Sequence, residues 1–126
     1  MRATRRPGPR LGDRGQAAVE FAVALPIVVI AMLAIAQVGV AVRNEVAVEL
    51  AAREGARAAA VSADPAAAGA AARRAVELPM DVAVSVDATT VTVTVTYVDP
   101  TDIAIIGAAI GPVTHRASAT MAIEPP

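Results

Sequence analysis

One carboxylate, Glu20, stands at the edge of the longest apolar stretch of the chain and is the first candidate for chemistry. It lies five residues after Gly15, and no residue from Phe21 to Val42 is charged. An acid at the edge of hydrocarbon costs free energy unless it reaches the headgroups or pairs with a cation. Two interpretations follow: an interfacial side chain that extends into the headgroups, or a carboxylate that forms an ion pair.

Other residues that could do chemistry are few. The chain has no cysteine, which excludes disulfide and thiolate chemistry. His115 is the only histidine, and we expect an ordinary loop or strand-edge position for it. Asp99 and Asp102 flank a Pro-Thr pair and are typical of turn and helix-capping residues, not of metal ligands. We therefore expect no enzyme activity, no metal and no cofactor.

The apolar stretch from Phe21 to Val42 has the length of a membrane span. Its 22 residues would form a helix of roughly 33 Å, against a hydrocarbon core of about 30 Å. The arginines that precede it predict a cytoplasmic N-terminus by the positive-inside rule. Everything after Val42 is then extracytoplasmic.

Composition describes what the rest of the chain can be. The 126 residues leave room for one small domain beyond the span, and aromatic residues are limited to Phe21 and Tyr97. Small side chains dominate the 56% of hydrophobic residues, so we expect a thin core. A net charge of −1 argues against nucleic-acid binding by bulk attraction.

The chain divides into three parts. Residues 1–15 form a basic leader that we expect to be disordered, and residues 16–62 are predicted to form one long helix, membrane-spanning at about 21–42. Residues 63–126 form a small domain that starts with a second, Ala-rich helix from Pro65 to about Leu78. Pro26 lies inside the apolar run and predicts either a helix kink or simple tolerance of proline in a membrane helix.

The C-terminal part changes to a period of two, which predicts strands. Three alternating segments are present, with a hairpin connection at Asp87-Ala88-Thr89; their apolar positions are Val82, Val84 and Val86, then Val91, Val93, Val95 and Tyr97, then Ala117, Ala119, Met121 and Ile123. The fold class is therefore α+β: a long helix, a second helix and a three-stranded antiparallel sheet. Because the valine and threonine faces of the middle segment are so regular, an exposed edge there would take up another strand.

Two further features have alternative interpretations. The stripe Ala47, Ala51, Gly55 and Ala59 could contact the protein's own sheet or a helix of another subunit. The segment from Asp99 to Pro112 carries four isoleucines, too many for a bare loop. It is interpreted as a short helix packed on the sheet, or as a patch that meets a partner or the membrane surface.

Several sequence blocks together resemble the TadE/TadG-like family, minor pseudopilins of the bacterial tight-adherence (Flp, type IVc) pilus machinery. The blocks are Arg14-Gly15-Gln16-Ala17-Ala18-Val19-Glu20-Phe21-Ala22, Leu25-Pro26, Ala51-Ala52-Arg53-Glu54-Gly55-Ala56-Arg57-Ala58-Ala59 and Ser118-Ala119-Thr120-Met121-Ala122-Ile123-Glu124. The first block is the specific one, with the layout of a type III (prepilin) signal. The shortness of the chain is typical of the small TadE-like members.

The resemblance implies a pilin-like form of the α+β fold and a function. A prepilin peptidase would cut between Gly15 and Gln16, and Glu20 would become position five of the mature chain. Glu20, with Phe21 beside it, would then act in assembly by pairing with the N-terminal amine of a neighbouring subunit. The implied partners are other pilins or pseudopilins, the pilus assembly platform and the bilayer of the inner membrane.

Two other classes of protein fit parts of the sequence. A secreted protein could be cut after Ala34-Ile35-Ala36, although the apolar run continues beyond that site. A permanent single-pass anchor for a small binding domain would keep its original start. The mature N-terminus distinguishes the three.

Overall fold

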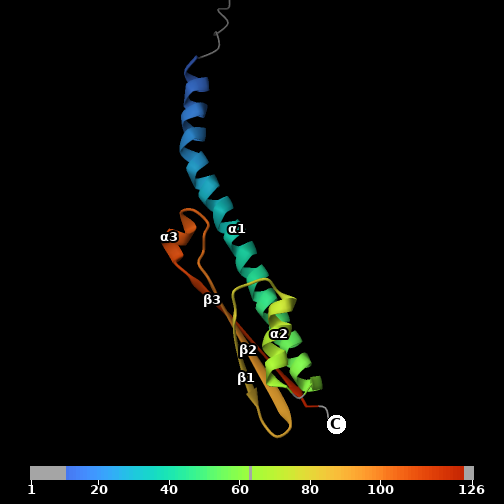
Figure 1. The fold of residues 1–126 in the computed structure, drawn as a ribbon. Helices are drawn as coiled ribbons and strands as arrows, with labels where there is room; N and C mark the ends of the chain where they lie inside the picture. Colours follow the sequence, from blue (N-terminus) through green and yellow to red (C-terminus); the bar gives the residue numbers. More distant parts are fainter. Residues whose placement is uncertain (1–10, 63, 124–126) are drawn as a thin grey trace, which may run out of the picture.

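The computed structural model describes residues 11–62 and 64–123 and has the α+β architecture that the sequence predicts (Figure 1). A long helix, α1 (Leu11–Ser62), is followed by a second helix, α2 (Pro65–Ala75). The strands β1 (Asp81–Val86), β2 (Thr90–Asp99) and β3 (Val113–Ala122) form the sheet, and a short helix, α3 (Ile106–Ile110), connects the last two. The greater part of the predicted leader, residues 1–10, lies outside the described residues.

Helix α1 has two different environments along its length. Its N-terminal part stands clear of the rest of the molecule, whereas its C-terminal part lies against α2 and the sheet (Figure 1). Every residue from Gly15 to Met32 is exposed. The helix begins at Leu11, earlier than the predicted residue 16. Pro7 and Pro9, which lack the N–H that a helix interior requires, precede that start.

Helix α2 starts as the sequence predicts and ends early. The Asp64 side chain accepts a hydrogen bond from the Ala66 N–H at 2.9 Å, and Pro65 occupies the first turn. The predicted end at about Leu78 is wrong, because the backbone is already extended at Val76. The extended backbone lets Val76 and Leu78 pack against the core. In addition, the helical conformation is unfavourable for Leu78, because Pro79 follows it.

The sheet is antiparallel, with the strands in the order β1-β2-β3. The alternation on β2 buries its apolar residues against the helices: Val91, Val93, Val95 and Tyr97. The opposite face carries hydroxyl pairs, Thr92 with Thr120 and Thr94 with Ser118, each at 2.8 Å. Because β2 is the central strand, β1 and β3 pair with its two edges, and the regular strand is not at an edge of this sheet.

The small-residue stripe of α1 packs inside the domain. Ala51 and Ala59 are buried, and a Cβ added to Gly55 would lie 3.1 Å from both the Ala68 carbonyl oxygen and Val93 Cγ1. The stripe therefore lets α2 and the sheet approach the backbone of α1 at the same level. This confirms internal packing as its role and excludes a contact with another subunit through the same atoms.

Helix α3 is short, as predicted, but it contacts α1 and lies beyond the end of the sheet (Figure 1). β2 and β3 remain paired as far as Asp99 and Val113. The connection therefore projects past the last strand pair, where α1 is the element that it can pack against. The expectation of a helix packed on the sheet is wrong in this respect.

Candidate functional site

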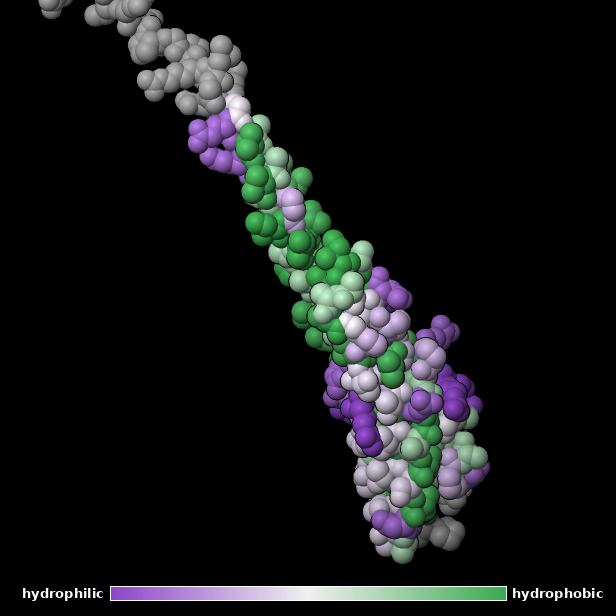
Figure 2. Space-filling view, turned by 90° about the vertical axis from the view of Figure 1, so that its left-hand side faces the viewer, coloured by the Kyte–Doolittle hydropathy of each residue, from purple (hydrophilic) through white to green (hydrophobic). Residues whose placement is uncertain are grey.

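The residues predicted to carry function all lie on the exposed N-terminal part of α1. Gly15, Gln16, Glu20, Phe21 and Pro26 are each exposed. They occupy a helix surface that contacts no other described element, and Figure 2 shows that surface as a mainly apolar rod that leads into a more polar domain. These side chains are therefore accessible from outside the molecule.

Glu20 is held by a neighbour one helical turn away. The Gln16 side-chain amide donates a hydrogen bond to Glu20 Oε1 at 3.0 Å, the i,i+4 geometry that helices favour. The carboxylate of Glu20 remains exposed and is accessible to other chains. If the chain began at Gln16, the same carboxylate would lie at the positive end of the helix dipole, which stabilises a negative charge.

The peptide bond between Gly15 and Gln16 lies inside α1. A carbonyl inside a helix accepts a hydrogen bond from the residue four positions later, so a peptidase has to open this turn before it can attack. Glycine weakens a helix by about 1 kcal/mol relative to alanine. No atom lies within 4 Å of a Cβ added at Gly15, so the fold places no packing requirement on this residue.

Helix α1 continues through Pro26 without interruption. Proline removes one helix hydrogen bond, here the one that the Ala22 carbonyl would accept. In Figure 1 the N-terminal part of α1 is inclined to its C-terminal part. A kink at Pro26 itself stays a prediction.

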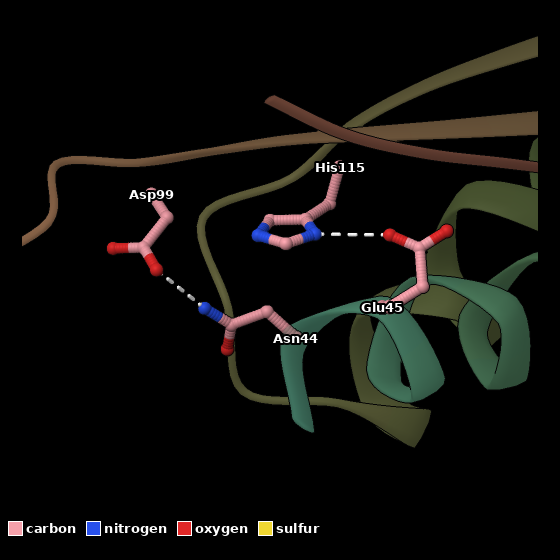
Figure 3. Close-up of polar contacts among 4 residues, drawn as sticks. All are labelled: Asn44, Glu45, Asp99 and His115. Atoms are coloured by element: carbon pink, nitrogen blue, oxygen red, sulfur yellow. Dashed lines mark hydrogen bonds and ion pairs between the residues drawn. The ribbon is translucent and has the colours of Figure 1, made fainter. Parts of the chain in front are cut away.

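A second group of polar residues lies where the domain meets α1, and we call it the polar cluster: Asn44, Glu45, Asp99 and His115 (Figure 3). Two adjacent residues of α1 reach the ends of two strands. Asn44 Nδ2 donates to Asp99 Oδ2 at 2.8 Å, and Glu45 Oε2 lies 2.9 Å from His115 Nδ1. Both contacts join segments that are far apart in the sequence.

His115 is buried, as are Asn44 and Asp99 of the polar cluster. Its side chain is 5% exposed, against 50% for that of Glu45, and its ring stacks on Tyr97 with the centroids 6.3 Å apart. Its Nε2 atom has no hydrogen-bond partner among the described residues. The expected strand-edge position agrees with the structure, because β3 is an edge strand. The expectation did not include the burial of His115 or its contact with Glu45 of α1.

The polar cluster joins α1 to the sheet through two side-chain contacts. Asp99 also accepts the Thr101 N–H at 2.9 Å, as expected of a turn residue. Within residues 11–62 and 64–123, no group of three or more histidine, aspartate or glutamate side chains could hold a metal. A nucleophile beside His115 is likewise absent from the polar cluster.

The sequence held a signal for this cluster. Gln37, Asn44 and Ala51 follow one another at seven-residue spacing, which places two polar side chains on the buried face of α1. A polar residue on a buried helix face requires a partner. For Asn44 that partner is Asp99, whereas both side-chain polar atoms of buried Gln37 lack one among the described residues.

By length and composition, α1 can cross a membrane. Its most apolar window has a mean hydropathy of 2.6 and is fully exposed. The molecule therefore has the form of a single-pass membrane protein with a small α+β domain at one end of its span.

A segment in the first half of the chain matches a known family. Residues 15–57 match the family model described as TadE-like protein, which confirms the resemblance over the segment from the predicted cleavage site to the buried stripe. No curated protein and no solved structure matches the chain significantly. The match suggests a component associated with the Tad pilus, and the family is one of structural proteins, not of enzymes.

Proposed function

We propose that this chain is a pseudopilin-like component of a tight-adherence (type IVc) pilus or a related secretion apparatus. A prepilin peptidase cuts it between Gly15 and Gln16, and the mature chain helps to assemble the pilus from the inner membrane. The N-terminus is cytoplasmic and the domain after the span is extracytoplasmic. Its partners are the peptidase, other pilins or pseudopilins, and the assembly platform.

One observation carries this proposal: Gly15 and Glu20 lie at the N-terminal side of the exposed apolar part of α1, inside the segment that matches the TadE-like family. A globular protein would bury such a helix, because exposed apolar area costs about 25 cal/mol per Å² in water. Lipid and neighbouring helices are the surroundings in which this surface is stable. An acid at the edge of hydrocarbon is stabilised by reaching the headgroups or by pairing with a cation. The second of these is the pairing role that we propose for Glu20.

The amine that cleavage creates is a suitable partner for Glu20. The new α-amino group of Gln16 is positively charged near neutral pH. In the low dielectric of a membrane or a filament core, its attraction to a carboxylate is much stronger than in water. A pair of this kind between neighbouring subunits can fix their register, because an unpaired charge is costly in every other alignment.

The mature N-terminus tests the proposal. The full-length chain is co-expressed with a prepilin peptidase, recovered from membranes and measured by intact-mass spectrometry. A chain that begins at Gln16 supports the proposal. A chain that begins at Gln37 indicates secretion by the general pathway, and an uncut chain indicates a permanent anchor; either result overturns it.

A further inference from the structure

We propose that the connection around α3, residues 103–112, is a second membrane contact that enters the acyl–headgroup boundary beside α1. The proposal rests on the membrane insertion of α1, which is part of the proposed function. It adds a lipid-binding surface contributed by the domain itself. The segment reads Ile-Ala-Ile-Ile-Gly-Ala-Ala-Ile-Gly-Pro and contains no charged residue.

The first argument is position along α1. A hydrocarbon core of about 30 Å takes up about 20 residues of helix, so a span that starts at Phe21 ends near Val40. Residues 21–32 are fully exposed, and loss of exposure begins at Leu33. Tilting of the helix lengthens the immersed part. It therefore moves the boundary toward Asn44 and further into the region that the domain contacts.

The connection around α3 is the part of the domain at this level. It follows the end of β2, where Asp99 accepts a hydrogen bond from Asn44 of α1, and α3 contacts α1. In Figure 1, α3 lies at the end of the domain nearest the free part of α1, with the β1–β2 hairpin at the opposite end. A membrane that covers the apolar run of α1 therefore meets this connection first.

The second argument is the exposure of large apolar side chains. Ile105 is 58% exposed and Ile110 is 56% exposed. They belong to a connection whose helix, α3, contacts α1, and the proposed function places the apolar surface of α1 in lipid. The connection thus continues that surface onto the domain.

The third argument is backbone conformation. Ile105 has a φ of 70° and Thr101 has a φ of 58°, values that are unfavourable for β-branched residues. The turn is tight, because a Cβ at Gly107 would collide with the Thr101 carbonyl oxygen. A strained turn of this kind is retained at functional positions, and here it holds an isoleucine outward at the level of the lipid boundary.

The fourth argument concerns Gln37. It is 5% exposed, and both polar atoms of its amide lack a hydrogen-bond partner among the described residues. It lies two turns before Asn44 on the same face of α1, within the immersed part of the helix. Among the elements that contact α1, α3 lies nearest the free part of the helix (Figure 1). We therefore assign to its connection the role of covering this amide, because an unpaired polar group costs most in lipid.

The test uses tryptophan as a depth probe, because the natural chain contains none. Ile105→Trp and Ile110→Trp are reconstituted, as full-length chains at low protein-to-lipid ratio, in vesicles of phosphatidylcholine and phosphatidylglycerol. One set of vesicles carries bromine on the upper acyl chains. Val28→Trp, in the span, and Val86→Trp, at the far end of the domain, are the matched controls; both valines are about half exposed.

We expect blue-shifted emission and loss of intensity in brominated vesicles for the probes at 105, 110 and 28, and neither effect for the probe at 86. If the probe at 28 is quenched and those at 105 and 110 behave like 86, α1 is inserted and the proposal is wrong. A blue shift without quenching means that protein covers the patch, which also overturns it. If the probe at 28 is not quenched, membrane insertion fails and the proposal fails with it. If the strained position 105 does not accept tryptophan, Ile110→Trp still tests the same connection.

Discussion

The Nδ1 atom of His115 on β3 lies 2.9 Å from the Oε2 atom of Glu45 on α1. This contact joins an edge strand to the helix that extends out of the domain. The adjacent bond from Asn44 to Asp99 does the same for the central strand. The sheet is thereby fixed to α1 at the end nearest the span. At its other end, the contact between the sheet and the helices depends on small apolar side chains.

We expect His115→Ala to destabilise the chain by about 1–3 kcal/mol, because it leaves a cavity and removes a buried hydrogen-bonded group. Denaturant unfolding of the full-length chain in detergent micelles measures this change. Glu49→Gln is the matched control, since its partner Arg53 is exposed and such pairs contribute about 0–1 kcal/mol. Equal effects of the two changes would contradict a structural role for the polar cluster.

Gly55 and Gly39 provide a matched pair of positions on α1. A Cβ at Gly55 would lie 3.1 Å from the Ala68 carbonyl oxygen, whereas nothing lies within 4 Å of one at Gly39. We expect Gly55→Ala to destabilise the fold by about 1–3 kcal/mol through overpacking, and Gly55→Leu to do more. Gly39→Ala should be neutral or slightly stabilising, because alanine favours a helix. Thermal unfolding followed by circular dichroism distinguishes them.

We expect Gly15→Leu to block processing without altering the fold, and Gly15→Ala to be partly tolerated. The space around a Cβ at Gly15 is open, so lost cleavage would report recognition by the peptidase and not misfolding. Gly39→Leu, also at an open position of α1, should be processed normally. Full cleavage of Gly15→Leu at the same bond would refute the assignment of the site.

Glu20→Gln and Glu20→Ala should leave cleavage largely intact and impair assembly. Glutamine preserves a hydrogen-bond acceptor for the Gln16 amide but removes the charge. If the charge is what pairs with a neighbour's amine, both variants lose cross-linking to partner subunits in membranes to a similar extent. Normal assembly by both would exclude the pairing role, and normal assembly by Glu20→Gln alone would assign Glu20 to hydrogen bonding.

The β1–β2 hairpin should lose stability in strong acid. Hydrogen bonds from the Thr89 N–H, the Thr90 hydroxyl and the Thr90 N–H lower the pKa of Asp87 from 3.8 to about 2. Because the folded pKa is the lower one, this contribution is present above pH 3.8 and is lost as the pH falls toward 2. Carboxyl titration by NMR measures the pKa, and Asp87→Asn should remove this part of the pH dependence. An Asp87 pKa near 3.8 would contradict the turn geometry.

The alternation of valine and threonine was sufficient to predict the strands, because a period of two has one structural meaning when β-branched residues carry it. The start of α2 was predictable for a similar reason, since Asp64 and Pro65 are local signals. These elements depend on residues that are close together in the sequence.

The features that the sequence did not reveal depend on distant residues. Asn44 and Asp99 are 55 positions apart, and Glu45 and His115 are 70 apart. No local pattern pairs them. The place of α3 was also missed, because its contact with α1 depends on how far β2 and β3 stay paired. The early end of α2 also depends on distant residues, because Val76 and Leu78 pack against a core that includes residues of α1 and the sheet.

Helix α1 has a mechanical consequence, because it runs from the exposed apolar half into the core with no flexible linker between them. A pull along its axis, applied at the mature N-terminus, would reach the sheet directly through the polar cluster and the packed stripe. The domain would then move together with α1 as one rigid body. Pro26 is the position at which we expect α1 to bend most easily, because proline favours kinks in helices. Extraction of α1 from the bilayer would therefore displace the span and the domain at the same time. Bending would be confined to the membrane-spanning part of α1.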